Sequence, residues 1–337
     1  MTGRKIGAAV EVLPHDAGRE EWLAARVPLV TASDIGVVLG ISPFGSPFNL
    51  FWVKRGAIPE DYDNERLSLG RHLEPWVADR FAEMHPEYHV ERAGLVVSTE
   101  RPYQGSTPDR VLYEYGDPID DERIEVAGDP AAALEIKTSA TFEEWGPDGS
   151  DEIPPYIRAQ ALWQLDTMGL DWVAVACLFL LTQKIRVYRI ERDETDIALM
   201  RERAAQFLDD VAAERVPDID HTEATAQALS LLYPLGGDGE AEIDADLAAD
   251  YRAAKADLDD ARDHYDLLSN RVRAAMGEAD AKYAVSGGAK IAVRSVYEQS
   301  GCDMDRLRAR HPGAYADCRT VHQVDKITPS KIKKDAA

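Results

Sequence analysis

Apolar residues recur along the first 235 positions of the chain with two different periods. Residues 66–85 carry them at intervals of three and four, which is the spacing of a helix with one buried face. Residues 132–139 alternate between two faces as strands do, and the apolar run at 172–181 predicts a buried strand. Further helices are predicted at 19–26, 31–40, 153–169, 194–213 and 222–233, and residues 42–56 predict a turn followed by a helix that ends at Gly56. Further strands are predicted at 89–98, 109–116 and 184–192. This order predicts a mixed α/β core.

The pattern changes after residue 235. Residues 236–242 form a glycine-rich and acidic segment that interrupts regular structure. Apolar residues then recur at steps of four and three along one predicted helix of roughly 30 residues, which is a heptad seam: Leu247, Tyr251, Ala254, Leu258, Ala261, Tyr265, Leu268, Val272 and Ala275. A hairpin at 282–297, a short helix at 303–312 and a strand at 319–327 follow. We therefore expect a core of residues 1–235 and a C-terminal appendage of residues 236–337, helical with a small β part. The seam needs a partner, either elsewhere in the chain or in a second subunit.

Composition and charge narrow the class of protein. Of 337 residues, 45% are apolar and 29% charged, and no apolar run approaches the ~20 residues of a membrane span. Three cysteines far apart make neither a disulfide framework nor a metal site, which favours a reducing, cytoplasmic setting. The net charge of −23 argues against a protein that simply coats nucleic acid. Residues 281–337 carry 11 basic and 6 acidic side chains, so this tail is either solvated surface or a local contact for DNA.

Two charged residues interrupt the strand at 132–139. Leu134 and Ile136 point to one face of the strand, so Glu135 and Lys137 point together to the other. Asp109 stands at the start of an earlier strand, directly after Pro108. Two carboxylates at adjacent strand ends can bind Mg²⁺ or Mn²⁺, and a lysine beside them can stabilise charge on a phosphate. The pattern is that of the PD-(D/E)xK nucleases.

That signature alone is weak, and two helical residues add to it. Glu74 lies one turn after Gly70 on the helix at 66–85, where an exposed surface glutamate is the plain alternative. Gln160 lies on the helix that follows Lys137, where a surface glutamine is the plain alternative. Trp145, in the loop after the strand, would either stack on a base or pack against the protein. No phosphate-binding loop with a Gly-Lys-Ser/Thr ending is present, which argues against ATP hydrolysis.

Several stretches occur in an order that resembles one family. They are REEWLAARVPLVTASDIGVVLGISPFGSP (19–47), GRHLE (70–74), GSTPD (105–109), LEIKTS (134–139) and YIRAQALWQLDTMGLDW (156–172). Together they resemble the YqaJ-type viral recombinase family, the relatives of phage lambda exonuclease, over about residues 19–215. The resemblance implies a PD-(D/E)xK core of the restriction-endonuclease type.

The family resemblance also implies residue roles. Glu74, Asp109 and Glu135 would hold the Mg²⁺ or Mn²⁺, together with the backbone carbonyl of Ile136. Lys137 would be the catalytic lysine.

The same resemblance implies one further residue of the catalytic site and three residues that bind the DNA end. Gln160 would line the catalytic site. Arg26 and Ser33 would bind the 5′-terminal phosphate of DNA, and Thr107 stands where relatives carry a serine, so its hydroxyl could still donate. A forked guanidinium and a hydroxyl at a helix start are suited to a phosphate.

The implied activity is that of a 5′→3′ exonuclease on linear double-stranded DNA. It would leave 3′ single strands for a single-strand annealing protein in phage-type recombination, in the cytoplasm of a bacterial host that carries a phage or prophage. A ring of three subunits is implied as well, although residues 236–337 extend beyond the resemblance and leave the assembly open. Two alternatives remain: an endonuclease or nickase on the same core, and a non-catalytic module that binds DNA ends or a recombinase.

Overall fold

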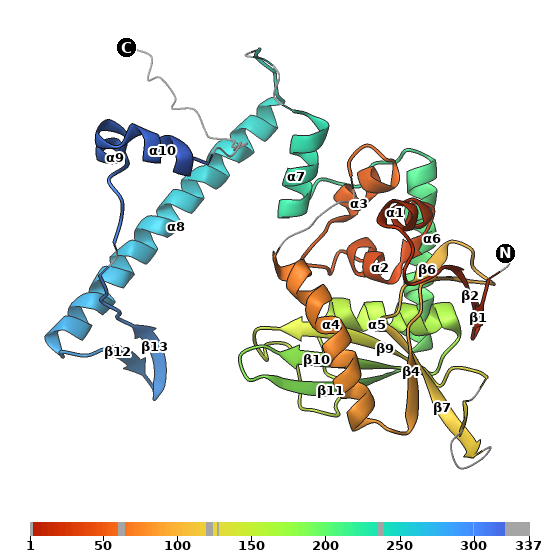
Figure 1. Cartoon of the computed structure of the whole chain (residues 1–337). Helices are drawn as coiled ribbons and strands as arrows, with labels where there is room; N and C mark the ends of the chain where they lie inside the picture. Colours follow the sequence, from red (N-terminus) through yellow and green to blue (C-terminus); the bar gives the residue numbers. More distant parts are fainter. Residues whose placement is uncertain are drawn as a thin grey trace. The chain divides into compact units, whose positions relative to one another are not determined.

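The computed structural model in Figure 1 describes residues 3–59, 65–118, 124–126, 128–234, 237, 239–298 and 300–320. It divides into two units, Met1–Leu235 and Gly236–Ala337. The described part of the first unit contains the helices α1 (Arg19–Arg26), α2 (Ala32–Val38), α3 (Pro47–Lys54), α4 (Glu65–Met84), α5 (Pro155–Met168), α6 (Glu194–Ala212) and α7 (Glu223–Leu232). None of the helices in the described ranges is long and apolar enough to cross a membrane.

The central sheet of the first unit has the strand order β11-β10-β9-β7-β4, with the short β8 paired to β7. Strands β9 and β10 are parallel, and the pairs β9–β7, β10–β11 and β7–β4 are antiparallel. The sheet is therefore mixed, and the mixed α/β class is confirmed. Its strands are β4 (Tyr88–Glu91), β7 (Arg110–Pro118), β8 (Ile124–Val126), β9 (Ala132–Ser139), β10 (Trp172–Phe179) and β11 (Lys184–Glu191).

A second sheet, which the sequence did not predict, lies across helix α5 from the first. Its order is β1-β2-β5-β6-β3, and its strands are β1 (Lys5–Ile6), β2 (Ala9–Leu13), β3 (Val30–Thr31), β5 (Leu95–Ser98) and β6 (Gln104–Ser106). These strands have two to five residues each, too few to display a period. The single strand expected at 89–98 was wrong, because its first part is β4 of the central sheet and its second part is β5 of this one.

Helix α5 lies between the two sheets and is the most buried helix of the unit. Trp163 is fully buried and donates a hydrogen bond from Nε1 to the carbonyl of Val30 in β3, 3.0 Å away. On the other side, α5 packs against the face of the central sheet that carries Ala133, Val173 and Val175. A helix that contacts a sheet on each side has no free face, which is why its side chains have little periodic contrast.

Helix α4 covers the opposite face of the central sheet (Figure 1). Val77 and Phe81 of α4 are buried against Leu134 and Ile136 of β9. Successive residues of β9 thus face α4 and α5 in turn, as the sequence predicted for this strand.

The carboxyl end of α5 is held against the N-terminal hairpin by close backbone contacts. The N–H of Ala8 donates to the carbonyl of Met168 over 2.7 Å. A Cβ atom on Gly7 would come within 2.2 Å of that carbonyl oxygen, and Gly7 has a φ of +55°. Gly169 ends the helix at φ +68°, where a Cβ would approach the Cβ of Ala8 to 2.8 Å. Both positions therefore require glycine.

The second unit consists of α8 (Ala245–Glu278), a hairpin of β12 (Tyr283–Ser286) and β13 (Ala289–Val293), α9 (Met304–Arg310) and α10 (Pro312–Cys318). The long helix and the hairpin follow the sequence pattern, whereas α10 was not expected. The apolar seam of α8 is exposed, with Leu258 at 63% and Tyr265 at 71%. The described part of this unit thus supplies no partner for the seam, and the strand predicted at 319–327 falls almost wholly outside the described residues.

A buried carboxylate fixes α5 to its surroundings. Asp166 is inaccessible to solvent and accepts hydrogen bonds from Gln104 at 2.8 Å, from Arg192 at 2.7 Å and from Arg201 Nε at 2.9 Å, with Arg101 at 3.4 Å. Burial by itself would raise the pKa of Asp166, but the hydrogen bonds from Arg201, Gln104 and Arg192 outweigh it and lower the pKa.

Asp166→Asn is expected to lower the free energy of unfolding by roughly 2–3 kcal/mol at neutral pH, because it leaves the arginines without their shared counter-charge. The loss should shrink as the pH falls through the lowered pKa of Asp166, where the wild-type carboxylate itself becomes protonated. Urea unfolding followed by circular dichroism measures both effects. Glu100→Gln, which removes the exposed partner of Arg101, is the control and should change stability little. Equal effects of the two substitutions would contradict the role given to Asp166.

Candidate active site

Glu135 and Lys137 project from β9 toward α5, on the face opposite Leu134 and Ile136. Glu135 is only 3% exposed, and its Oε1 lies 2.5 Å from Nζ of Lys137. Burial alone would lower the pKa of Lys137, but the negative charges of Glu135 and Asp109 outweigh it and raise the pKa. Lys137 is therefore a charged ammonium group at neutral pH, already directed at a carboxylate.

Two amides of α5 complete the surroundings of Glu135. Gln160 Nε2 donates to Oε1 of Glu135 over 2.6 Å, and Gln164 Nε2 donates to Oε2. The two glutamines lie four residues apart and so project from one side of the helix. The predicted position of Gln160 beside Glu135 is thus observed. Gln164 was missed, although its spacing of four from Gln160 was a usable signal.

Asp109 lies directly beside this pair, at the start of β7. Its Oδ2 accepts a hydrogen bond of 2.7 Å from the backbone N–H of Ile136 on the neighbouring β9. Burial and the charge of Glu135 raise the pKa of Asp109 well above its usual range, and Lys137 opposes them only in part. Two carboxyl groups and one ammonium group thus share a buried site, and carboxylate oxygens are the kind of ligand that a divalent cation binds.

Glu74 approaches the same place from α4 but has a different partner. Its Oε1 lies 2.7 Å from NH1 of Arg110, a buried arginine next to Asp109 that was not predicted from the sequence. Within the described ranges, no group of three or more His, Cys, Asp or Glu side chains is arranged to hold a metal ion. The ligand set of Glu74, Asp109, Glu135 and the Ile136 carbonyl therefore stays a prediction. The oxygen donors themselves suit Mg²⁺ or Mn²⁺.

The predicted phosphate-binding residues gather around the start of α2. NH2 of Arg26 donates to the hydroxyls of Ser33 at 2.8 Å and Thr31 at 3.0 Å. The ring of Trp22 lies 4.2 Å from the guanidinium carbon of Arg26. Thr31 is the residue that caps α2, with Asp34 completing the capping box, so Ser33 belongs to the first turn of the helix. Arg26 and Ser33 are thus together, as predicted.

A buried ion pair stabilises this cluster. Asp34 lies 2.9 Å from Nζ of Lys54 and 3.3 Å from NH2 of Arg26. Burial would raise the pKa of Asp34, but the charges of Lys54 and Arg26 outweigh it and lower the pKa. Lys54 also donates to the backbone carbonyl of Arg26 over 3.0 Å. Asp34 and Lys54, neither of which was predicted, fix the position of Arg26.

Thr107 and Trp145, the two remaining predicted residues, lie in loops. Thr107 lies in the turn between β6 and β7, two residues before Asp109, and none of the described contacts links it to Arg26. Trp145 packs against Phe179 and Tyr188, with ring centroids 5.6 and 5.1 Å away. Of the two roles considered for Trp145, the structure favours packing.

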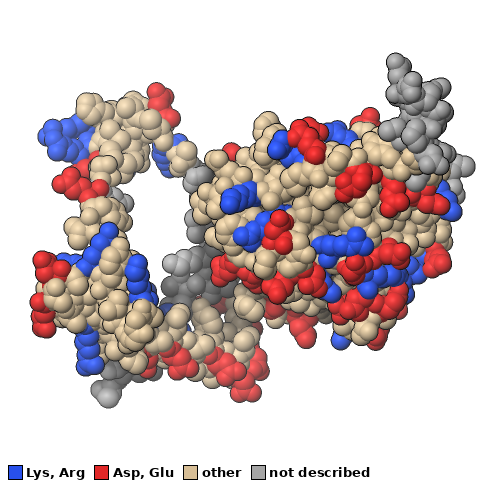
Figure 2. Space-filling view, turned by 90° about the horizontal axis from the view of Figure 1, so that it is seen from below, with Lys and Arg blue, Asp and Glu red and all other residues tan. Residues whose placement is uncertain are grey.

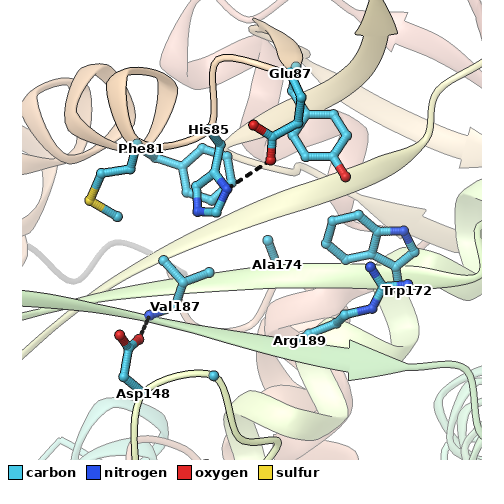
Figure 3. A pocket seen from close by; sticks show the side chains of 11 residues that line it. Phe81, His85, Glu87, Asp148, Trp172, Ala174, Val187 and Arg189 are labelled. Carbon is cyan, nitrogen blue, oxygen red and sulfur yellow. Dashed lines mark hydrogen bonds and ion pairs between the residues drawn. The ribbon is translucent and has the colours of Figure 1, made fainter.

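A groove of about 480 Å³ lies on the α4 face of the central sheet (Figure 3). Phe81 of α4 and His85, directly after this helix, line it, and Trp172 stacks there against Arg189, whose guanidinium carbon is 4.0 Å from the ring centroid. None of the predicted site residues lines this groove. The cluster around Glu135 faces α5 instead.

The sequence of this part of the chain is similar to a known protein family. The model of the YqaJ-like viral recombinase domain matches residues 21–171, the segment that contains Arg26, Glu74, Asp109, Glu135 and Gln160. This segment of the chain is similar to the YqaJ-like viral recombinase domain. The chain is similar along 94% of its length to an uncharacterized protein, YqaJ, of Bacillus subtilis (strain 168), which is 23% identical over 331 residues and is itself covered to 94%.

Solved structures match part of the chain, with low TM-scores. An alkaline exonuclease from Laribacter hongkongensis is 23% identical with a TM-score of 0.44, and the match covers 58% of this chain and 93% of that one. A phage-related exonuclease from Haemophilus somnus 129PT is 11% identical with a TM-score of 0.39, covering 55% of this chain and 96% of that one.

Asp109→Asn is expected to raise the thermal midpoint of the metal-free protein at pH 7.5. The pKa of Asp109 is raised in the folded state, so its contribution to stability falls as the pH rises from the usual carboxyl range through that raised value. Relief of about 1 kcal/mol would raise the midpoint of a domain of this size by roughly 2–4 °C. Calorimetry in EDTA measures the shift, which should shrink toward pH 4. Asp79→Asn, at an exposed position on α4, is the control, and a lowered midpoint for Asp109→Asn would contradict the argument.

Proposed function

We propose that the chain is a metal-dependent deoxyribonuclease that removes nucleotides from the 5′ ends of linear double-stranded DNA. The observation that carries the proposal is the contact of Glu135 with Lys137 and Gln160, beside Asp109, within a YqaJ-like viral recombinase domain. The product would be a duplex with 3′ single-stranded tails, suited to phage-type recombination with a single-strand annealing protein in the bacterial cytoplasm.

The roles of the residues follow from their charges and contacts. Asp109, Glu135, Glu74 and the carbonyl of Ile136 would hold Mg²⁺ or Mn²⁺, which when bound supplies an activated water and neutralises phosphate charge. For Glu74 to join them, its carboxylate has to leave or share Arg110. Lys137 is charged and would stabilise the negative charge that develops on the scissile phosphate.

Glu135 has to keep one orientation while charge builds up beside it. The amides of Gln160 and Gln164 donate to its two oxygens and hold the carboxylate plane. A group fixed in advance contributes more to the transition state than one that must reorganise.

Recognition of the DNA end is assigned to the cluster at the start of α2. Arg26 and Ser33 present a guanidinium and a hydroxyl together, and the first backbone N–H groups of α2 face the same region. Thr107 would add a hydroxyl from the turn before Asp109. A terminal 5′-phosphate bound there would place the end of one strand at a fixed distance from the catalytic group.

The surface charge is consistent with a local rather than an extended DNA contact. On the face shown in Figure 2, acidic side chains predominate and basic ones occur in small clusters between them. With a net charge of −23, most of the surface repels DNA. Binding would rest on the few cations gathered at the site, and assembly into a ring of three subunits would multiply these contacts.

Lys137→Ala is expected to lower the rate of nucleotide release from linear duplex DNA by a factor of about 100 or more, because it removes one charge that stabilises the transition state. The substrate carries 5′-phosphates and a label in each strand, and Mg²⁺ is supplied and then withdrawn with EDTA. Lys184→Ala, on the edge strand β11, is the matched control and should keep full activity. If wild type releases no nucleotides, or if Lys137→Ala equals wild type, the nuclease proposal is wrong.

Closed circular DNA in the same assay separates the exonuclease from an endonuclease or nickase. An exonuclease leaves it intact, whereas nicking converts it to open circles. DNA-end binding without cleavage in any metal would instead support the non-catalytic module.

Replacing the 5′-phosphate by a 5′-hydroxyl is expected to slow degradation at least about tenfold, because charge-assisted hydrogen bonds to a phosphate are lost. This preference should largely disappear in Ser33→Ala, whose remaining activity reports on the catalytic group alone. Ser139→Ala, at the end of β9, serves as the hydroxyl control and should keep the preference. An equal preference in wild type and Ser33→Ala would remove Ser33 from end recognition.

A further inference from the structure

An exposed aromatic ring stands on a short loop between α2 and α3. Phe44 is 61% exposed, although the loop that carries it is well fixed. Gly40 begins the loop at φ +69°, and its last residue, Ser46, is buried and accepts a hydrogen bond of 3.0 Å from the N–H of Asn49 at the start of α3. The Phe44 N–H is bonded to the hydroxyl of Ser42 at 3.2 Å. The ring is therefore displayed on ordered backbone.

Phe44 is linked to the candidate active site through Tyr156. The two rings meet edge to face, with centroids 5.6 Å apart and planes at 84°. Tyr156 lies in the first turn of α5, four residues before Gln160, so both side chains project from one side of the helix. Burial raises the pKa of the Tyr156 hydroxyl and the charge of Lys137 opposes this, so the hydroxyl lies within electrostatic reach of the lysine.

A cation flanks the same ring. The guanidinium carbon of Arg66 lies 5.1 Å from the ring centroid of Phe44, and Arg66 is exposed in the first turn of α4. Helix α4 also carries Glu74, two turns further on. The two helices that bring Glu74 and Gln160 to the candidate site thus also bring Arg66 and Tyr156 to Phe44.

The chemistry of this arrangement favours a nucleic acid over a protein surface. A flat apolar ring accepts the face of any base, and a guanidinium beside it can contact the adjoining phosphate. We propose that Phe44, backed by Tyr156 and flanked by Arg66, is a stacking platform for a nucleobase of the DNA strand whose end enters the candidate active site. This inference rests on the proposed function and adds a binding element to it. The platform has no base-specific polar group, so it would not select sequence.

The test uses the full-length chain and a duplex with a 5′-phosphate and 2-aminopurine near that end, with Ca²⁺ in place of Mg²⁺ to preserve the end. Stacking quenches the fluorescence of 2-aminopurine beyond its level in the free duplex. Wild type is expected to quench it, and Phe44→Ala to lose the extra quenching and bind roughly 5- to 100-fold more weakly. Phe44→Trp should retain both. Tyr115→Ala is the control, since Tyr115 is an exposed aromatic about 20 Å along β7 from Asp109.

Each other outcome overturns the platform in a distinguishable way. Quenching and affinity unchanged in Phe44→Ala, while wild type still degrades DNA in Mg²⁺, remove the platform and leave the nuclease proposal standing. A shift in sedimentation of Phe44→Ala without change in quenching identifies the ring as a contact between copies of the chain. Wild type that neither binds nor degrades the DNA overturns the proposed function, and the platform with it.

Discussion

The arrangement of the first unit depends on one buried carboxylate. Glu135 lies on a face of the central sheet that a helix covers, where an unpaired charge would cost several kcal/mol. The covering helix supplies two amides, and the same strand supplies the ammonium group of Lys137. Glu135 is tolerated in the interior because these three side chains donate hydrogen bonds to its carboxylate. The chemistry proposed for this group and the packing of the core are therefore the same set of contacts.

Charge is distributed unevenly between the two clusters of the first unit. Around Glu135 and Asp109, carboxylates outnumber the nearby cations, and burial together with the charge of Glu135 raises the pKa of Asp109. Around Arg26, two cations share the single carboxylate of Asp34, and its pKa is lowered. One cluster thus favours a cation and the other an anion, which is the charge pattern that the proposed binding of a metal and of a terminal phosphate requires.

The sequence predicted most of the central sheet and its helices because their periods run over eight residues or more. It predicted Glu135, Lys137 and Gln160 as neighbours because strand alternation and the resemblance agreed. It did not reveal the second sheet, whose strands are too short, nor Arg110 and Lys54, whose partners lie 36 and 20 residues away in the chain. A charged residue that is buried through a distant partner is indistinguishable, in one sequence, from one that faces solvent.

The close fit of Gly7 and Gly169 has a consequence for how substitutions far from the catalytic group act. Any side chain at either position has to displace the end of α5 from the N-terminal hairpin. The helix is packed on two sides, so a displacement at one end is passed along its axis as a rigid shift. Gln160 and Gln164 belong to this helix and would move with it. A substitution in the N-terminal hairpin would therefore change the position of these amides, although the hairpin is far from Glu135 in the sequence.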